Sequence, residues 1–378
     1  MSIPLYKPYL PIKNCDFAED SLACGWLGYG EKAQKLETLF AERYGGWALA
    51  VTSCTSSLYL AARCMKRNDN DEVIIPAITF VSTGMAFRAA GYSVVCADVD
   101  AQGLLSIDSV KSAITPNTRA IVAVHLYGQR VHLDELRRLC DGYDIYLVED
   151  CAHRVAIDDE SHPGDFCCFS FNTMKELPSG EGGLLLGKDL KFETMAREFA
   201  NLGLTENTLQ RTTYLKHNKY NFGLEHGLKF LQNDIIASLT LKLMDVLDSN
   251  RIKRKMIFEK YNTTLSKYKE FYTFNREDDD SCLMFVVRIA ELYVDEFRDF
   301  LALKGIASSH HYPNLSEHPL FEKRVPCPIA EQYEKEIISL PCFVEMTEEQ
   351  IDMISDAIEE FAIQKGLSPN SNRKSDEQ

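Results

Sequence analysis

Three short apolar runs in the middle of the chain end in residue types that could do chemistry together. The first, 143–151, carries Asp150 near its end, the second, 167–171, is followed by Lys175, and the third, 180–188, opens with Gly-Glu-Gly-Gly. Such runs of Val, Leu and Phe, broken by small or polar residues, are typical of buried strands. Ligands in open α/β sheets bind beyond the carboxyl ends of the strands, so we expect Asp150 and Lys175 to face one crevice.

A carboxylate and an amine in one crevice are what pyridoxal phosphate requires. The lysine forms a Schiff base with the aldehyde, and the acid keeps the pyridine nitrogen protonated so that the ring draws electrons. Against this, most lysines are solvated surface groups, and an acid that ends a buried strand is common in any doubly wound fold. Asp150 and Lys175 alone leave both interpretations open.

Length and composition limit the class of protein. The chain has 378 residues, of which 45% are hydrophobic, enough for two domains with a sizeable core. It has no run of about 18 apolar residues, and its first residues do not resemble a signal peptide, so we expect no membrane span. Its 12 cysteines are scattered without a Cys-x-x-Cys pair, which favours a reduced, cytoplasmic protein without a metal site.

The chain is acidic, with a formal net charge of −15. No basic stripe is available to neutralise phosphates, so we expect no nucleic-acid partner. An anionic small ligand stays compatible with this charge because it needs only local donors. Solubility is the simplest interpretation of the acidity.

Strand-like and helix-like segments alternate through the first half of the chain, which predicts a mostly parallel sheet with helices on both faces. The loop 52–57, between the first strand and its helix, is rich in Ser and Thr. Such a loop is either a phosphate cradle at a helix N-terminus or an ordinary N-cap. The expected strands are 48–51, 72–76, 93–98 and 120–126, and the expected helices are 31–44, one ending at 90, 107–114 and 133–140.

The second half predicts a smaller domain. Residues 1–245 are expected to form a large cofactor-binding domain with an irregular N-terminal arm, 246–366 a smaller α+β domain, and 367–378 a disordered tail. A polar stretch at 202–226 is expected to be a long functional loop. The other expected elements are helices 190–201, 233–268, 294–304, 329–338 and 348–364 and a strand at 283–289.

Over residues 1–365 the chain resembles the DegT/DnrJ/EryC1/StrS group of fold-type-I pyridoxal-phosphate enzymes, the sugar aminotransferases. Each matching segment is short, but their order and spacing together carry the resemblance. It implies a mostly parallel seven-stranded sheet between helices, followed by a smaller C-terminal α+β domain. The matching segments are 25–27, 53–58, 71–83, 124–128, 148–153, 168–177, 180–183, 311–313 and 338–341.

The resemblance implies roles for individual residues. Lys175 corresponds to the Schiff-base lysine, whose free amine then moves a proton between the substrate carbon and the cofactor. Asp150 corresponds to the partner of the pyridine nitrogen, Phe80 to the aromatic that stacks on the ring, and His153 to the residue beside the ring's phenolic oxygen. Ser170, with Cys54 and Thr55, matches the phosphate-binding positions. The alternatives are a core Phe, a satisfied His and a strand-end Ser.

Two positions depart from the family pattern. Cys54 stands where many relatives have Gly. The cysteine keeps the backbone N–H group but adds a Cβ atom that glycine lacks. Lys229 stands where many relatives have an Asn that reaches the cofactor phosphate of the neighbouring subunit. Trp26 and His311 are further candidates for contacts with the substrate or across subunits.

By this resemblance we expect a homodimer with shared active sites that transfers the amino group of L-glutamate to a nucleotide-linked keto-sugar. Glutamate would leave as 2-oxoglutarate, with pyridoxamine phosphate formed during turnover. The expected substrate is a dTDP-4-keto-6-deoxyhexose aminated at C4, in amino-sugar biosynthesis for a surface polysaccharide such as O-antigen or for a glycosylated metabolite.

Other functions stay open at this point. They are amination at C3, a dehydratase of the same family, and a non-catalytic regulator that keeps the fold. In the dehydratases a His replaces the Schiff-base lysine, so Lys175 weighs against that branch. A dinucleotide-dependent dehydrogenase is disfavoured because no Gly-x-Gly-x-x-Gly follows an early strand.

Overall fold

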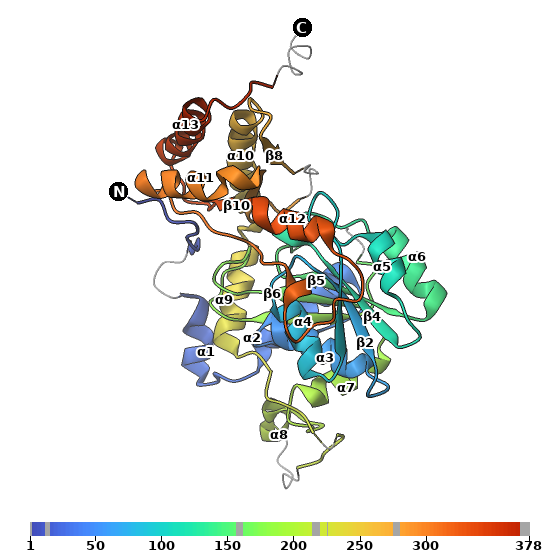
Figure 1. The fold of residues 1–378 in the computed structure, drawn as a ribbon. Coiled ribbons are helices and arrows are strands. Elements are labelled where there is room, and N and C mark those ends of the chain that lie inside the picture. Colours follow the sequence, from blue (N-terminus) through green and yellow to red (C-terminus); the bar gives the residue numbers. More distant parts are fainter. Residues whose placement is uncertain are drawn as a thin grey trace.

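A seven-stranded sheet forms the centre of the molecule (Figure 1). The computed structural model describes residues 2–11, 16–155, 162–213, 220–224, 226–274 and 280–370. The strand order is β1-β7-β6-β5-β4-β2-β3, with β2 to β6 parallel and with β7 antiparallel to both β1 and β6. The prediction of a mostly parallel seven-stranded sheet is confirmed. The strands are β1 Trp47–Val51, β2 Glu72–Pro76, β3 Ser93–Ala97, β4 Thr118–Val124, β5 Tyr146–Cys151, β6 Phe166–Ser170 and β7 Gly183–Gly187.

Helices cover both faces of this sheet, which explains why its strands read as continuous apolar runs. Side chains alternate along each strand, so Leu49 and Val51 of β1 face one core, and Ala48 and Ala50 face the other. Helices α3, α4 and α7 pack on the first face, and α2, α5, α6 and α9 on the second. These helices are α2 Glu31–Tyr44, α3 Cys54–Met65, α4 Ser82–Ala89, α5 Ile107–Ala113, α6 Asp134–Tyr143, α7 Lys191–Phe199 and α9 Asp234–Met244.

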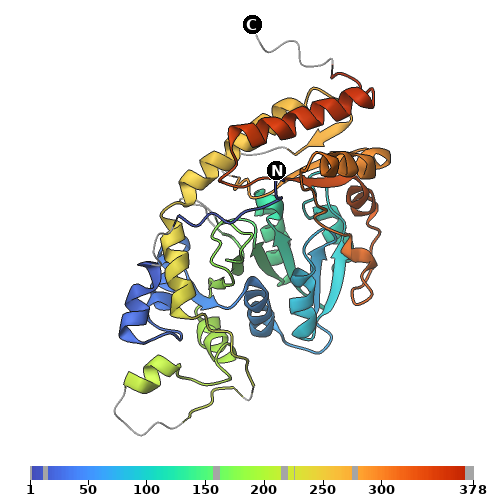
Figure 2. The ribbon, with the colours of Figure 1, turned by 90° about the vertical axis from the view of Figure 1, so that its left-hand side faces the viewer.

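A second, three-stranded sheet of order β10-β9-β8 lies above the first and has its own hydrophobic core (Figures 1 and 2). Residues 2–6 run along it, because Ile3 exchanges backbone hydrogen bonds with Gly305 and Ala307. Its elements are β8 Phe271–Thr273, β9 Phe285–Ile289, β10 Ile337–Leu340, α10 Leu247–Leu265, α11 Glu291–Leu303 and α13 Glu348–Gln364. Two further elements of this half of the chain, η3 Leu315–Glu317 and α12 Pro328–Glu336, place Leu315, Ala330 and Tyr333 in the core of the large sheet.

The single helix predicted over 233–268 is wrong. Two helices, α9 and α10, occupy this stretch, and the chain leaves helical geometry at Val246, where φ is −115° and ψ is 4°. In Figure 2, α9 lies beside the large sheet and α10 continues toward the second sheet. The apolar pattern runs through both helices because each buries one face. The break falls at the predicted domain boundary, and we propose that the large and small domains meet between residues 245 and 246.

Other boundaries also differ from the predictions. The arm predicted as irregular contains η1 Asp16–Ala18 and α1 Glu19–Cys24, and the stretch predicted as a loop contains α8 Thr208–Thr213. α12 ends at Glu336, because the next residues pair with β9 as β10. The predicted tail lies outside the described residues from 371 onward.

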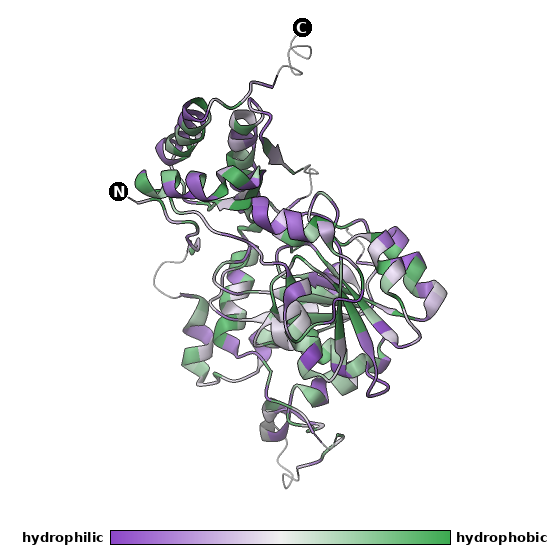
Figure 3. Cartoon of the chain, viewed as in Figure 1, coloured by the Kyte–Doolittle hydropathy of each residue, from purple (hydrophilic) through white to green (hydrophobic). Residues whose placement is uncertain are grey.

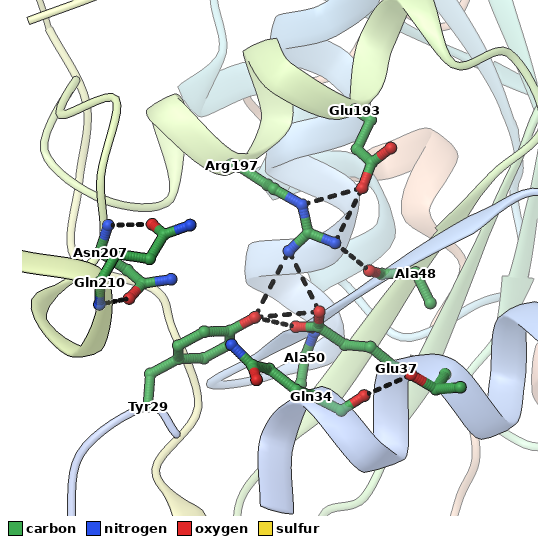
Figure 4. A network of polar contacts seen from close by, with 10 residues as sticks. Tyr29, Gln34, Glu37, Ala48, Ala50, Glu193, Arg197, Asn207 and Gln210 are labelled. Atoms are coloured by element: carbon green, nitrogen blue, oxygen red, sulfur yellow. Dashed lines mark hydrogen bonds and ion pairs between the residues drawn. The ribbon is translucent and has the colours of Figure 1, made fainter. Parts of the chain in front are cut away.

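β1 is an edge strand, and charged side chains bond two of its outer backbone groups (Figure 4). Glu37 Oε1 accepts the N–H of Ala50 at 2.9 Å, and Arg197 Nη2 donates to the Ala48 carbonyl at 3.0 Å. The two side chains also pair with each other at 3.1 Å. Glu37 comes from α2 and Arg197 from α7, on opposite faces of the sheet. We call this pair the edge clip.

Hydropathy along the ribbon follows the same layers. In Figure 3 the strands of the large sheet are mostly hydrophobic, whereas the surrounding helices alternate between hydrophilic and hydrophobic residues. No helix in the described ranges combines the length and the apolar character needed to cross a membrane.

Candidate active site

A cavity of about 520 Å³ opens at the carboxyl ends of β4, β5 and β6. It is where the topology of an open α/β sheet places a ligand. The structure brings eight of the predicted site residues into its lining and leaves out Trp26 and Lys229. The eight are Cys54, Thr55, Phe80, Asp150, His153, Ser170, Lys175 and His311.

Asp150 is fully enclosed near the end of β5. Its Oδ2 accepts a hydrogen bond from the Thr83 hydroxyl at 2.9 Å, and its Oδ1 accepts the N–H of Ala152 at 3.1 Å. Burial raises the pKa of Asp150, and the bonds from Thr83 and Ala152 and the nearby charge of Lys175 oppose that rise. The carboxylate is therefore held in one orientation by two donors.

Lys175 follows β6 in a turn closed by its own N–H, which donates to the Asn172 carbonyl at 2.9 Å. The Tyr6 hydroxyl donates to the Lys175 carbonyl at 3.1 Å, so the N-terminal segment also fixes this backbone. Burial lowers the pKa of the Lys175 amine to about 8, although Asp150 opposes the shift. A sizeable fraction of the amine is thus neutral near physiological pH, as a nucleophilic lysine requires.

The residue after this lysine anchors the turn to α10. Glu176 is buried and accepts bonds from Arg251 Nε at 2.7 Å and from the N–H of Val155 at 2.5 Å. These contacts fix the backbone on which Lys175 sits.

The loop before α3 has features of both an ordinary N-cap and a phosphate-binding loop. Ser53 is an N-cap, because its hydroxyl accepts the N–H of Ser56 at 3.1 Å while Ser56 returns a bond to the Ser53 N–H. Cys54 and Thr55 occupy the first helical positions, whose N–H groups have no intrahelical acceptor, and both line the cavity. The Cys54 side chain points into the protein, with its Sγ 3.4 Å from the Cys168 carbonyl and 3.7 Å from Asp150 Oδ1.

The other wall of the cavity is aromatic. Phe80 lines the cavity and is 54% exposed, so its ring is available to cover a ligand. Its ring lies 5.8 Å from that of Tyr312. His311 Nδ1 lies 2.8 Å from the Ser339 hydroxyl, and burial, with help from His310 and Lys175, lowers the pKa of His311 to about 4.

Sequence reasoning missed Tyr312 and Thr83. Tyr312 lines the cavity and stacks on His153, with ring centroids 6.0 Å apart, yet the 311–313 segment pointed first to its histidine. Thr83 bonds both Asp150 and Thr79, four residues earlier. Two hydroxyl residues four apart around the start of a helix were the only sequence signal for it.

Trp26 and Lys229 lie away from the cavity of their own chain. The Trp26 ring is half-buried, and its Nε1 donates to the Tyr29 carbonyl at 3.0 Å. Lys229 is exposed, next to Phe230, whose carbonyl accepts the Thr52 N–H at the end of β1. Any contact of these two side chains with a ligand would need another chain or a change of conformation.

The described part of the chain has two other places with clustered ionic or metal-binding residue types. A second cavity, of about 480 Å³, lies beside the edge clip, and its ionic groups are already bonded to one another. A buried cluster of His125, Glu149, Cys151 and His162 has the composition of a metal site. However, His125 Nδ1 accepts the Val131 N–H, so its Nε2 carries hydrogen and donates to Glu149 at 3.1 Å. We interpret the cluster as a hydrogen-bonded core network, and the absence of a metal stays a prediction.

A known protein family matches almost the whole chain. The model of the DegT/DnrJ/EryC1/StrS aminotransferase family matches residues 13–359. The chain belongs to this family. The expectations of a fold-type-I α/β architecture and of an enzyme of the aminotransferase class are confirmed.

Known proteins align with almost the whole length of this chain. It is 29% identical to the spore coat polysaccharide biosynthesis protein SpsC of Bacillus subtilis (strain 168), over 95% of this chain and 97% of that protein. The crystal structure of the aminotransferase TlmJ from Streptoalloteichus hindustanus superposes with a TM-score of 0.88 at 25% identity, covering 96% of this chain and 100% of that one. The PMP form of the putative sugar aminotransferase Spr1654 from Streptococcus pneumoniae shares the fold, with a TM-score of 0.86 at 23% identity, over 96% and 99% of the two chains.

Proposed function

We propose that this protein is a pyridoxal-phosphate-dependent aminotransferase that transfers the amino group of L-glutamate to a nucleotide-linked keto-sugar. The observation that carries the proposal is the single cavity that holds the buried amine of Lys175 and the oriented carboxylate of Asp150. Family membership supports the amino transfer.

The residues present fit this cofactor. Lys175 would hold its aldehyde covalently, and Asp150 would bind the pyridine nitrogen. The exposed ring of Phe80 would cover one face of the cofactor ring. The free N–H groups of Cys54 and Thr55 at the start of α3 would bind the phosphate, and Ser170, whose side chain lines the same cavity, would add a hydroxyl.

When bound, pyridoxal phosphate withdraws electrons from the carbon that carries the amino group. The chain's own groups supply the proton transfers. Lys175, with a pKa of about 8, is suited to accept and return a proton near neutral pH. Asp150, held by Thr83 and Ala152, would supply the carboxylate that pairs with a protonated pyridine nitrogen.

The sugar substrate is supported by the relatives. SpsC is named for polysaccharide biosynthesis, and Spr1654 is described as a putative sugar aminotransferase. We propose a dTDP-4-keto-6-deoxyhexose aminated at C4, for an amino sugar of a surface polysaccharide. The presence of Lys175 favours amino transfer over dehydration.

We also propose a cytoplasmic homodimer with shared active sites. Exposed Lys229 is available to the cofactor phosphate of a second copy, and Trp26 lies outside its own cavity as well. Every cysteine in the described part of the chain is a free thiol, which is compatible with a reducing compartment.

The test is the visible spectrum of the protein with pyridoxal phosphate, before and after L-glutamate. The wild type and a Lys191→Ala control, which loses an exposed lysine, should show the band of the lysine-bound cofactor and lose it with glutamate. Lys175→Ala should never show that band. A wild type that binds no cofactor would refute the proposal, and a bound cofactor that ignores glutamate would refute the donor.

A further inference from the structure

The Tyr312 hydroxyl lies at the cavity, and its hydrogen bonds determine whether it can donate to a ligand. Tyr312 is only 9% exposed, and its oxygen lies 3.2 Å from His153 Nε2. Its segment is tied to the large sheet, because the N–H of Leu315 donates to the Ala77 carbonyl at 2.7 Å. Among the residues that the structure describes, His153 is the hydrogen-bond partner of this hydroxyl.

A backbone group fixes the direction of the bond between His153 and Tyr312. The N–H of Tyr127, which can only donate, lies 3.1 Å from His153 Nδ1. Burial, with smaller contributions from Lys175 and His311, lowers the pKa of His153, so the ring is neutral. A neutral imidazole has one acceptor and one donor nitrogen, and therefore Nε2 carries the hydrogen and donates to the Tyr312 oxygen.

The hydrogen of the Tyr312 hydroxyl is then available to donate to a ligand in the cavity. Burial raises the pKa of Tyr312, so the phenol stays protonated and acts as a donor. Because its oxygen already accepts a bond from His153, its own O–H is polarised further. The other titratable groups that face this pair are Asp150, Lys175, His311 and Tyr127.

We propose that Tyr312 donates the hydrogen bond to an anionic oxygen of the ligand in this cavity. His153 acts one step further away, as a positioning residue that holds the hydroxyl. The inference rests on the proposed function, in which the ligand is pyridoxal phosphate and the acceptor is its ring oxygen. It replaces the expectation that His153 itself serves that oxygen.

The experiment is a pH titration of the visible spectrum of the protein loaded with pyridoxal phosphate. Removing a donor from an anionic oxygen raises the pH at which that oxygen loses its proton. Tyr312→Phe should therefore move the midpoint upward by about one to two pH units. His153→Asn keeps an acceptor for the Tyr127 N–H and should give a smaller upward shift. The double variant should match Tyr312→Phe alone, because both changes act through one hydroxyl.

Tyr92→Phe is the matched control. It removes a buried hydroxyl that donates to the Ala62 carbonyl at 3.0 Å, outside the cavity. Its midpoint should stay at the wild-type value. A midpoint that moves in His153→Asn but not in a folded Tyr312→Phe would overturn the inference, as would additive shifts. A wild type that binds no cofactor would overturn the proposed function together with it, whereas an unmoved midpoint in a cofactor-loaded Tyr312→Phe would overturn this inference alone.

Discussion

Replacing Thr83 with Val should weaken cofactor binding without unfolding the protein. Thr83 is 1% exposed, and its hydroxyl donates to Asp150 Oδ2 at 2.9 Å. A hydrogen bond to a charged group contributes roughly 1.5–3 kcal/mol. Its loss raises the pKa of Asp150 further, and the protonated acid cannot hold the proton of a pyridine nitrogen. We expect the affinity for pyridoxal phosphate to fall about 10- to 100-fold.

Thr83→Ser separates the hydroxyl from the methyl group. The serine keeps the donor and loses one buried methyl, which costs about 1 kcal/mol of stability. It should bind the cofactor nearly as well as the wild type. The measurement is a fluorescence titration with pyridoxal phosphate, beside thermal melts. A folded Thr83→Val that binds as tightly as the wild type would show that Asp150 does not depend on this donor.

Three further predictions follow from contacts around the cavity. Arg251→Met removes the cation bonded to the buried carboxylate of Glu176 and should lower the free energy of unfolding in urea by roughly 3–5 kcal/mol, whereas a change below about 1 kcal/mol would contradict this. Gly183→Ala places a Cβ 2.4 Å from the Ser53 backbone carbon, so thermal melts should show a loss of about 1–3 kcal/mol together with weaker cofactor binding. Because the pKa of Lys175 is lowered to about 8 in the folded cofactor-free protein, the unfolded state binds more protons than the folded state between pH 8 and about 10. The free energy of unfolding should therefore rise with pH in that window by up to about 3 kcal/mol. Lys175→Met should abolish this rise.

Much of the fold follows from local pattern. The predicted helix 31–44 and the predicted helix 348–364 match α2 and α13 at both ends, because each has an apolar stripe and a clear boundary. The break at Val246 could not be read in this way, since apolar spacing continues across it. α1 and α8 are six residues each, too short for a periodic signal.

The site divides along similar lines. Residues at strand ends, such as Asp150 and Ser170, could be placed from topology, because all parallel strands end at one edge. The partners that set their chemistry could not, since Thr83 is 67 residues from Asp150, and Tyr312 is 159 residues from His153. Lys229 is exposed and lies outside the cavity of its own chain, so its proposed contact with a cofactor phosphate involves a second copy.

The edge clip has a consequence for association. An unpaired strand edge can recruit a strand from another molecule and so begin open-ended aggregation. Glu37 and Arg197 reach around both faces of the sheet and occupy the donor at Ala50 and the acceptor at Ala48 that an incoming strand would use. The backbone of residues 230–232 bonds the Ala50 carbonyl and the Thr52 N–H on the same edge. Together with this segment, the two charged side chains make the outer edge of β1 a poor template for a foreign strand.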